Sequence, residues 1–326
     1  MPRIRNTKGL WLVMAAAMVV MPIGEAGAGG GRKGITLDAG YRRDNLDWNI
    51  AGSNNSPNVL SELTWRDLNI FQVRGELAGA NVEHVYFRTT FDYGWVVSGE
   101  NQDSDYAGDN RSLEFSRSIN SVNGSKVWDV SLGMGKEFPF GAKQQHSIIP
   151  QLGFSYHSQN LNMTDGNQVL WNTGYAQLID PEAGTQPLGP FAGLRSSYDA
   201  TWAGPWLGMD VLWNQRESGT LRLRLEAHQA WYSAKANWNL RSEFDHPVSF
   251  KHEANGYGMV LDLAWRGAPV RHRWVWGVDL SYQRWTTDAG TDTTYLIDPC
   301  YCYSEGRLNE VNWSSMALSV SLRKEM

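Results

Sequence analysis

Apolar and polar residues alternate strictly over residues 255–283, which gives the first indication of the fold. The apolar set occupies every second position and is rich in aromatic residues: Tyr257, Met259, Leu261, Leu263, Trp265, Trp274, Trp276, Val278, Leu280 and Tyr282. Because successive side chains of a strand point to opposite faces, the pattern predicts two strands, each with one apolar face. Gly267 and Pro269 lie between the two runs and predict a tight turn, so the stretch should form a hairpin.

The same alternation recurs along the chain and predicts about ten strands. The other runs are about 35–42, 59–77, 85–97, 128–135, 148–157, 207–213, 221–228 and 316–322. In the second run, Leu63, Trp65, Phe71, Val73 and Leu77 share one parity and should share one face. A strand shows such a face when one side meets lipid and the other meets the interior of a barrel.

The connections between these runs alternate in length. Four are short (78–81, 139–145, 214–219 and 266–271) and five are longer or more polar (51–58, 98–124, 160–190, 241–254 and 286–307). Outer-membrane barrels have short periplasmic turns and long extracellular loops. The sequence therefore predicts an all-β, transmembrane, antiparallel up-and-down barrel over residues 29–326, with both termini in the periplasm. A soluble β-sandwich is the alternative.

The N-terminus predicts export from the cytoplasm. Residues 1–28 combine a basic start, an apolar run over residues 10–23 and the small-residue sequence Ala26-Gly27-Ala28, as a secretory signal does. An N-terminal membrane anchor is the alternative, although the run is shorter than the roughly 20 residues of a spanning helix. The formal net charge of −5 gives no sign of a nucleic-acid partner. The predicted location is the bacterial outer membrane.

The opposite parity of the strands carries charged residues that should face the lumen: Asp38, Arg42, Arg88, Asp92, Asp129, Asp210, Arg222, Arg224, Glu226, Asp262 and Asp279. A barrel of about ten strands is too narrow for a wide aqueous channel, which needs roughly 16–18 strands. These charges therefore predict a packed network of ion pairs, with a small polar conduit as the alternative.

Three short segments resemble the omptins, a family of ten-strand outer-membrane barrels that includes surface proteases and adhesins. Ser61-Glu62-Leu63-Thr64-Trp65 is similar to the omptin sequence S-Q-L-D-W, and Asp103-Ser104-Asp105-Tyr106 resembles D-Q-D-W. Asp245-His246 stands where omptins carry D-x-H, without the intervening residue. The chain also resembles the outer-membrane protein family named for Protochlamydia. The omptin resemblance implies catalytic roles for Asp103, Asp105, Asp245 and His246.

The chemistry that such a site needs is only partly matched. Asp103 and Asp105 share a face on an extended segment, and two nearby carboxylates raise one pKa; the alternative is a solvated acidic loop. Asp245 and His246 are adjacent, so a regular strand would point them to opposite faces unless a bulge intervened. An ordinary loop histidine is the alternative reading of His246, and His252 in the same predicted loop could replace it.

The function that the sequence favours is a non-catalytic surface barrel whose loops bind something outside the cell. Its expected partners are outer-membrane lipid or lipopolysaccharide and an extracellular ligand or peptide; no cofactor or metal site is predicted. Aromatic residues of the predicted loops should supply the contacts: Tyr106, Trp171, Tyr175, Tyr295, Tyr301 and Tyr303. Cys300 and Cys302, one residue apart, could form a labile disulfide in an oxidising compartment. An omptin-like endopeptidase and a narrow porin-like pore are the alternatives.

Overall fold

The computed structural model describes residues 33–215, 219–268, 274–297 and 302–326. The predicted signal of residues 1–28, Cys300 and Tyr301 lie outside the described residues. Among the residues that are described, no helix is long and apolar enough to cross a membrane. The elements are β1 (Gly34–Ile50), a 3-10 turn (Ser53–Asn55), β2 (Ser61–Ala80), β3 (Val85–Gly108), β4 (Ser112–Ser121), β5 (Lys126–Lys136), β6 (Phe138–Phe140), β7 (His146–Trp171), α1 (Thr173–Ala176), β8 (Gly189–Pro190), β9 (Arg195–Gln215), β10 (Gly219–Asn237), β11 (Phe250–Arg266), β12 (Trp274–Thr287), β13 (Gly290–Leu296) and β14 (Cys302–Glu325).

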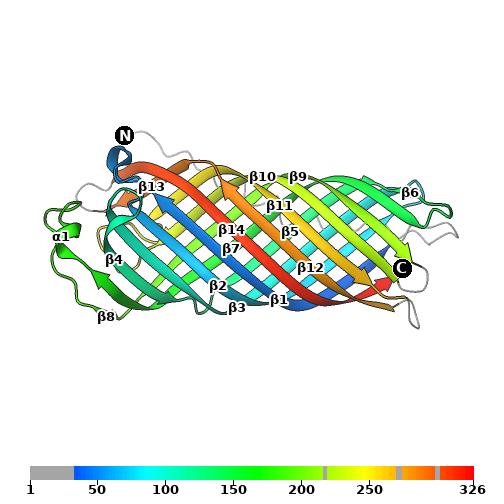
Figure 1. Ribbon diagram of the computed structural model, residues 1–326, viewed down its shortest axis with the longest axis horizontal. Coiled ribbons are helices and arrows are strands. Elements are labelled where there is room, and N and C mark those ends of the chain that lie inside the picture. The colour runs from blue at the N-terminus through cyan, green and yellow to red at the C-terminus, as the bar shows by residue number, and fades with distance from the viewer. Residues whose placement is uncertain (1–32, 216–218, 269–273, 298–301) are drawn as a thin grey trace. The chain divides into compact units, whose positions relative to one another are not determined.

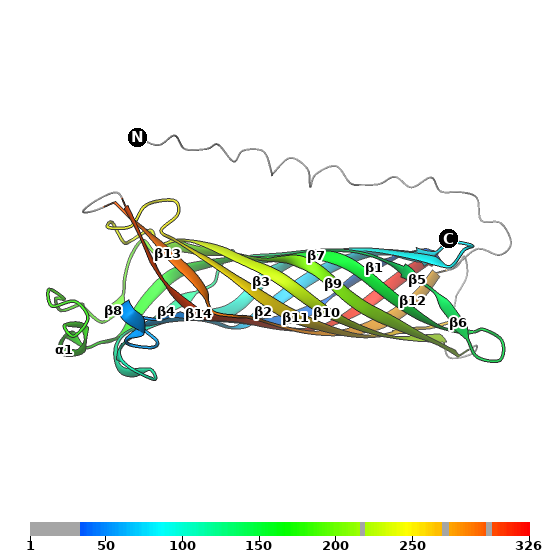
Figure 2. The ribbon, with the colours of Figure 1, turned by 90° about the horizontal axis from the view of Figure 1, so that it is seen from above.

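The long strands form one closed antiparallel barrel (Figures 1 and 2). The order runs β1-β2-β3, through β5 to β7, then β9-β10-β11-β12-β14, and β14 pairs back onto β1 from Gly34↔Glu325 onward. β4 and β5 lie end to end between β3 and β7, and β13 and β12 lie end to end between β11 and β14. The wall therefore has ten positions. This confirms the predicted ten-strand barrel and excludes a sandwich.

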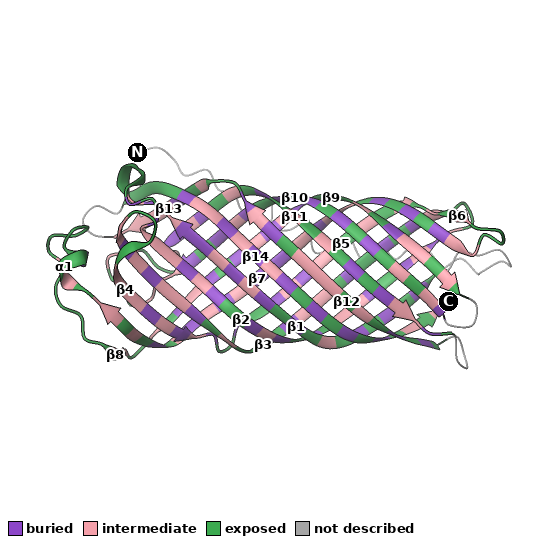
Figure 3. Ribbon diagram, viewed as in Figure 1, coloured by how far each residue is buried: buried purple, intermediate pink, exposed green. Residues whose placement is uncertain are grey.

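Outward-facing side chains form a continuous apolar band around the barrel. Residues such as Leu37, Val73, Phe91, Leu132, Leu152, Leu207, Leu223, Leu261, Leu318 and Val320 are exposed on it. Figure 3 shows exposed and buried residues alternating along the strands. Exposed aromatic residues border the band at the long-loop end (Tyr41, Phe71, Trp95, Trp231, Tyr257) and at the short-turn end (Phe138, Trp213, Trp274, Trp276). An apolar band between two aromatic girdles is the surface of a barrel in lipid.

The strands continue well beyond this band, which corrects the predicted loops. Much of the expected loop 98–124 is strand, because β3 runs to Gly108 and β4 follows at Ser112. β7 likewise reaches Trp171, and β13 occupies part of the expected loop 286–307. The polar composition of these segments had suggested loops, but polar residues are compatible with strands that stand in water. The strand ends that flank the four short connections lie at the end where β1 begins and β14 ends, as predicted.

A pair of β-bulges changes which face the residues of β2 and β3 occupy. The register between these strands shifts near Arg66 and Asn69, and Asp67 has a left-handed φ of 53°. As a result Leu63 and Trp65 are fully buried inside the barrel, whereas Phe71 is exposed on the lipid face. The prediction that these residues share one face was therefore wrong, since an extra residue in a strand reverses the parity beyond it.

Aromatic residues fill the lumen at and beyond the outer girdle. Trp48, Trp65, Trp202, Trp285 and Trp313 are buried there in one apolar cluster, and Trp285 stacks on Trp313 with ring centroids 5.6 Å apart. We call this cluster the aromatic plug. Its packed rings occupy the lumen toward the long-loop end.

Candidate functional site

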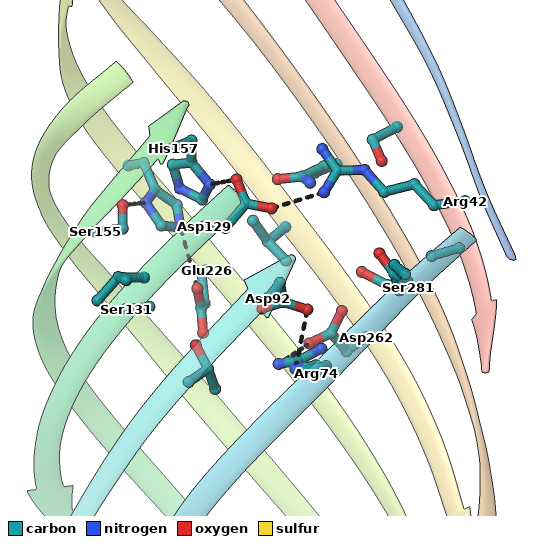
Figure 4. Close-up of a pocket in the computed structure, with 18 of the residues that line it drawn as sticks. Arg42, Arg74, Asp92, Asp129, Ser131, Ser155, His157, Glu226, Asp262 and Ser281 are labelled. Atoms are coloured by element: carbon teal, nitrogen blue, oxygen red, sulfur yellow. Dashed lines mark hydrogen bonds and ion pairs between the residues drawn. The ribbon is translucent and has the colours of Figure 1, made fainter. Parts of the chain in front are cut away.

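Charged side chains fill the lumen below the aromatic plug, and Arg42 organises the upper part of this network (Figure 4). Its guanidinium donates to both oxygens of Asp44 at 2.7 Å and to Asp129 at 2.6 Å. Asp129 in turn lies 2.9 Å from Nδ1 of His157. All of these groups are buried. Buried charges persist when each is paired and hydrogen-bonded, as here.

A second group of pairs lies nearer the short-turn end. Arg224 binds Asp210 through two hydrogen bonds, at 2.8 and 2.9 Å, and reaches Glu76 at 3.1 Å. Arg222 donates to the other oxygen of Glu76 at 2.8 Å. Arg88 pairs with Glu226. The predicted inward parity and the predicted ion-pair network are both confirmed by these contacts.

Ser155, His228 and Glu226 form a short chain within this network. Ser155 Oγ lies 3.1 Å from Nδ1 of His228, and Nε2 of His228 lies 3.1 Å from Glu226. The three residues line a cavity of about 70 Å³ together with Arg42, Arg74 and Asp262. Such a cavity holds a few water molecules. The aromatic plug lies between this cavity and the long-loop end of the lumen.

Asp103 and Asp105 lie on β3 beyond the lipid band, and both face inward. Asp103 pairs across the sheet with the buried residues Leu63 and Ser118, and Asp105 pairs with Ser61 and Ser116. The two aspartates therefore share a face, as predicted, but they belong to a strand and not to a loop tip. Their inward direction depends on the bulge, because Trp95 and Val97 at the same odd parity face outward.

Burial raises the pKa of Asp103 well above its usual range, and the neighbouring carboxylate of Asp105 adds to the rise. Burial also raises the pKa of Asp105, while the hydroxyl of Ser61 and the guanidinium of Arg241 oppose it. Arg241 belongs to the connection between β10 and β11, so this connection faces the aspartate pair. The pair is a partly desolvated carboxylate site toward the long-loop mouth of the barrel.

The structure does not assemble the second half of an omptin-type site from Asp245 and His246. Both residues are exposed in the connection between β10 and β11. Asp245 accepts a hydrogen bond from the backbone N–H of His246 at 2.7 Å. The imidazole Nδ1 lies 2.8 Å from Asn237. The histidine is therefore oriented by an amide and not by a carboxylate, which leaves it without the partner that strengthens a general base.

His252 is the inward-facing histidine of this region; the sequence offered it as a replacement for His246, but in a loop, whereas it lies on β11. It is completely buried, with Nδ1 2.8 Å from the Tyr198 hydroxyl and Nε2 3.4 Å from Asp292. Trp48 packs edge-on against its ring at 4.7 Å. The inward parity of Phe250, His252 and Ala254 could have indicated this position. Full burial under aromatic rings keeps His252 away from bulk water.

The aromatic residues predicted to bind at the surface fall into two groups. Tyr303 and Tyr175 are exposed, at 63% and 38%. Tyr106 is buried, with its hydroxyl directed at Glu62 at 3.4 Å, and Trp171 donates from Nε1 to the backbone oxygen of Gly184. The expectation for Tyr106 as a surface contact was therefore wrong, because it lies within a strand and not on a loop.

The state of Cys302 and the arrangement of possible metal ligands bear on the predicted site chemistry. Cys302 is disulfide-bonded. Within the described segments, no group of three or more His, Cys, Asp or Glu side chains is arranged to hold a metal ion. The candidate site is the inward pair of Asp103 and Asp105 together with the acidic strand ends and connections around it, which we call the acidic rim.

Comparison with known proteins agrees with this architecture. No curated protein matches the chain. Among solved structures, the chain is similar to the outer membrane protease OmpT from Escherichia coli, with a TM-score of 0.64 and 11% identity over 90% of this chain and 97% of that chain. It also matches the translocator domain of the autotransporter NalP from Neisseria meningitidis, with a TM-score of 0.32 and 9% identity over 89% of this chain and 88% of that chain.

At 11% identity the likeness to OmpT shows the fold alone, an outer-membrane β-barrel. A family model described as Protochlamydia outer membrane protein matches residues 36–326. This match spans nearly all of the barrel and confirms the resemblance seen in the sequence. The chain belongs to the Protochlamydia outer membrane protein family.

Proposed function

We propose that the protein is a closed, non-catalytic barrel of the bacterial outer membrane whose extracellular rim binds a cationic partner. The observation that carries this proposal is that the rim is acidic. Its only exposed histidine among the described residues of the candidate site, His246, is oriented by an amide and not by a carboxylate. Between residues 98 and 121, five carboxylates stand against two arginines, and residues 160–194 hold three carboxylates and no lysine or arginine. Loops and strand ends on a rigid scaffold are where binding residues concentrate.

The carboxylates of the rim differ in their availability to a partner. Glu62 is paired with Arg111 at 2.6 Å, and Glu114 is paired with Arg117. Asp103 and Asp105 have no guanidinium or ammonium group within 4.0 Å among the described residues. Arg241, the nearby cation that acts on both of them, pairs instead with Glu243. The aspartate pair therefore has capacity for an incoming positive charge.

The test is binding of fluorescently labelled oligolysine and oligoglutamate to the refolded mature barrel, followed by fluorescence anisotropy at low and physiological salt. We expect oligolysine to bind and an Asp103→Asn/Asp105→Asn double variant to lose at least fivefold in affinity. Asp199→Asn is the matched control, because this carboxylate faces outward, where Asn160 contacts it. Equal affinity of wild type and the double variant would refute the proposed site.

An omptin-like endopeptidase is the second candidate, favoured by the inward Asp103–Asp105 pair alone. Peptide cleavage by the refolded barrel with lipopolysaccharide tests it, using Asp103→Ala/Asp105→Ala and His246→Ala variants. We expect no cleavage from the folded wild type. Cleavage that both changes abolish would make the protein a protease and overturn the non-catalytic proposal.

Outer-leaflet lipid is the proposed membrane partner, reached after export through the signal of residues 1–28. Lys235 and Lys251 stand directly opposite each other on β10 and β11, farther toward the long-loop end than the girdle residues Trp231 and Tyr257. Lys251 also pairs with Glu253 at 2.6 Å. Two facing lysines repel each other, so an anionic lipid phosphate between them would be stabilising. When phosphorylated lipid is replaced by dephosphorylated lipid, the thermal stability of wild type should fall. The stability of a Lys235→Gln/Lys251→Gln variant should fall less.

A further inference from the structure

We propose that the periplasmic mouth of the lumen binds a small carboxylate with a short aliphatic body. A cavity of about 280 Å³ lies at the short-turn end, between the ends of β2, β9, β10, β11, β12 and β14. We call it the vestibule. It lies at the opposite end of the barrel from the acidic rim, so this proposal is independent of the function proposed above.

The arginines of the vestibule differ in their partners. Arg266 binds Asp279 through two hydrogen bonds at 2.6 and 2.7 Å, and Arg222 is shared between Glu76 at 2.8 Å and Asp279 at 3.6 Å. Arg323, on β14, has no carboxylate within 4.0 Å among the described residues. Its hydrogen bond is a 3.3 Å contact from Nη1 to the Thr36 hydroxyl.

Arg323 is held in place although none of the carboxylates that the structure describes pairs with it. Its cross-strand partners are Thr36 on β1 and Val275 on β12. The guanidinium lies over Gly34, where a Cβ atom would come within 2.7 Å of it. A positive charge in a partly buried site without a negative partner is costly, and an anion that enters the site removes part of this cost. The preset orientation of the guanidinium further favours a planar carboxylate, which it can bind through two hydrogen bonds.

The other walls of the vestibule indicate the body of the ligand. Ala78, Leu212, Ala264 and Val275 line it with apolar surface, and Ala78 and Leu212 belong to a small buried apolar cluster with Tyr86. An alkyl chain would lie on these walls with its carboxylate at Arg323. The volume is slightly below the roughly 300 Å³ at which drug-sized pockets begin, which limits the ligand to a short chain. Inorganic phosphate would leave the apolar walls unused.

Glu325 also lines the vestibule and faces the same side as Arg323. Its carboxylate lies beyond 4.0 Å from the guanidinium, so it does not pair with Arg323 directly. It would nevertheless repel an entering carboxylate. Replacing it with an uncharged isostere should therefore strengthen binding, and this gives a second variant with the opposite expected sign.

The experiment is isothermal titration of hexanoate into the refolded mature barrel at low salt, with hexylamine and inorganic phosphate as separate probes. We expect hexanoate to bind wild type at millimolar concentration, and hexylamine and phosphate to bind at least tenfold more weakly. Arg323→Gln should lose at least tenfold in hexanoate affinity, Arg323→Lys should lose less, and Glu325→Gln should gain. Lys324→Gln is the matched control, because Lys324 lies beside Trp274 on the outer surface.

Folding of each variant is checked by its heat-dependent migration on a denaturing gel, so that a lost barrel is not mistaken for a lost site. Phenylglyoxal modification of Arg323 in wild type, read by mass spectrometry, gives a measurement that needs no variant; hexanoate should slow it. Hexanoate affinity that is equal in wild type and folded Arg323→Gln would overturn the proposal. The proposal would also be overturned if 50 mM hexanoate gave no heat of binding and did not protect Arg323 from phenylglyoxal. If phosphate bound as tightly as hexanoate, the aliphatic body of the ligand would be excluded.

Discussion

Arg42 and Asp129 meet in the middle of the lumen, 2.6 Å apart, although 87 positions separate them in the sequence. Arg42 belongs to β1 and Asp129 to β5, and the strands β2 and β3 lie between them in the barrel wall. The contact therefore spans the interior and does not follow the sheet. It ties β1 to β5, and the Arg42–Asp44 pair within β1 holds the same guanidinium in place.

Loss of the Arg42 guanidinium should destabilise the barrel strongly. Arg42→Met leaves Asp44 and Asp129 buried without their main cation, and breaking a buried pair in this way costs about 3–5 kcal/mol. Arg43→Met is the matched control, because Arg43 is 53% exposed and pairs with the exposed Asp67; it should change stability by less than about 1 kcal/mol. Urea unfolding in detergent, followed by tryptophan fluorescence, compares the two. Similar midpoints would contradict the structural role of the cross-lumen pair.

The aromatic plug should make the barrel electrically silent. We expect no stable conductance from wild type in a planar bilayer, and small openings from a Trp285→Ala/Trp313→Ala variant, since these stacked rings occupy the lumen. The control Trp276→Ala removes an outward-facing ring that is 50% exposed and should leave the lumen closed. Regular wild-type openings would show that the plug moves and would revive the narrow pore.

The raised pKa of Asp103 predicts a pH-dependent stability. The folded state keeps the proton of Asp103 at pH values where the unfolded chain releases it, so folding takes up a proton in this window. Stability due to this group should therefore fall as pH rises from about 3.8 toward the raised pKa. Asp103→Asn should be more stable than wild type near neutral pH and equal to it near pH 3. Thermal unfolding across this range provides the measurement; a difference independent of pH would contradict the assignment.

Histidine modification should distinguish the exposed from the buried imidazoles. Diethyl pyrocarbonate should react rapidly with His246, which is exposed. His252, with no exposed surface, should react only after unfolding. Mass spectrometry of peptides from folded and denatured barrel reads both residues in one sample. Rapid reaction of His252 in the folded barrel would show that water reaches it and would reopen its role as a base.

Gly99 should be essential for the bulge that turns Asp103 inward. Its φ of 148° is strained for other residues, and a Cβ atom there would meet a Leu68 side-chain carbon at 2.8 Å. Gly99→Ala should cost about 1–3 kcal/mol of stability. Gly75→Ala is the control, because a Cβ atom at Gly75 meets nothing within 4 Å, and it should be neutral or slightly stabilising. Equal stability of the two variants would argue against a strained bulge.

Alternation alone was sufficient to predict the barrel, because the lipid band requires an apolar residue at every second position of each strand. The same reasoning placed Asp38, Arg88 and Asp210 inside. It could not identify the partners of these charges, since contacts such as Arg88–Glu226 depend on the register and tilt of strands that are distant in sequence. Parity also failed beyond Arg66 and Gly99, where bulges leave only a weak signal in the sequence.

The candidate site was harder to predict than the fold. Asp103 and Asp105 were identified by their resemblance to an omptin motif, and their spacing predicted a shared face, yet their inward direction comes from the bulge. Asp245 and His246 were chosen for their similarity to a family motif, although the inward histidine of this region is His252. Chemical type and spacing identify residues that could act together. Burial decides which of these residues can meet water and each other, and burial depends on the whole barrel.

The length of the strands has a consequence for what can reach the rim. On β7 the outward aromatic residue Tyr156 marks the edge of the lipid band, and the strand continues to Trp171. Fifteen residues at about 3.3 Å each, on a strand tilted by about 40°, rise about 38 Å. The rim therefore stands clear of the lipid headgroups, at a height where it can be reached without contact with the bilayer.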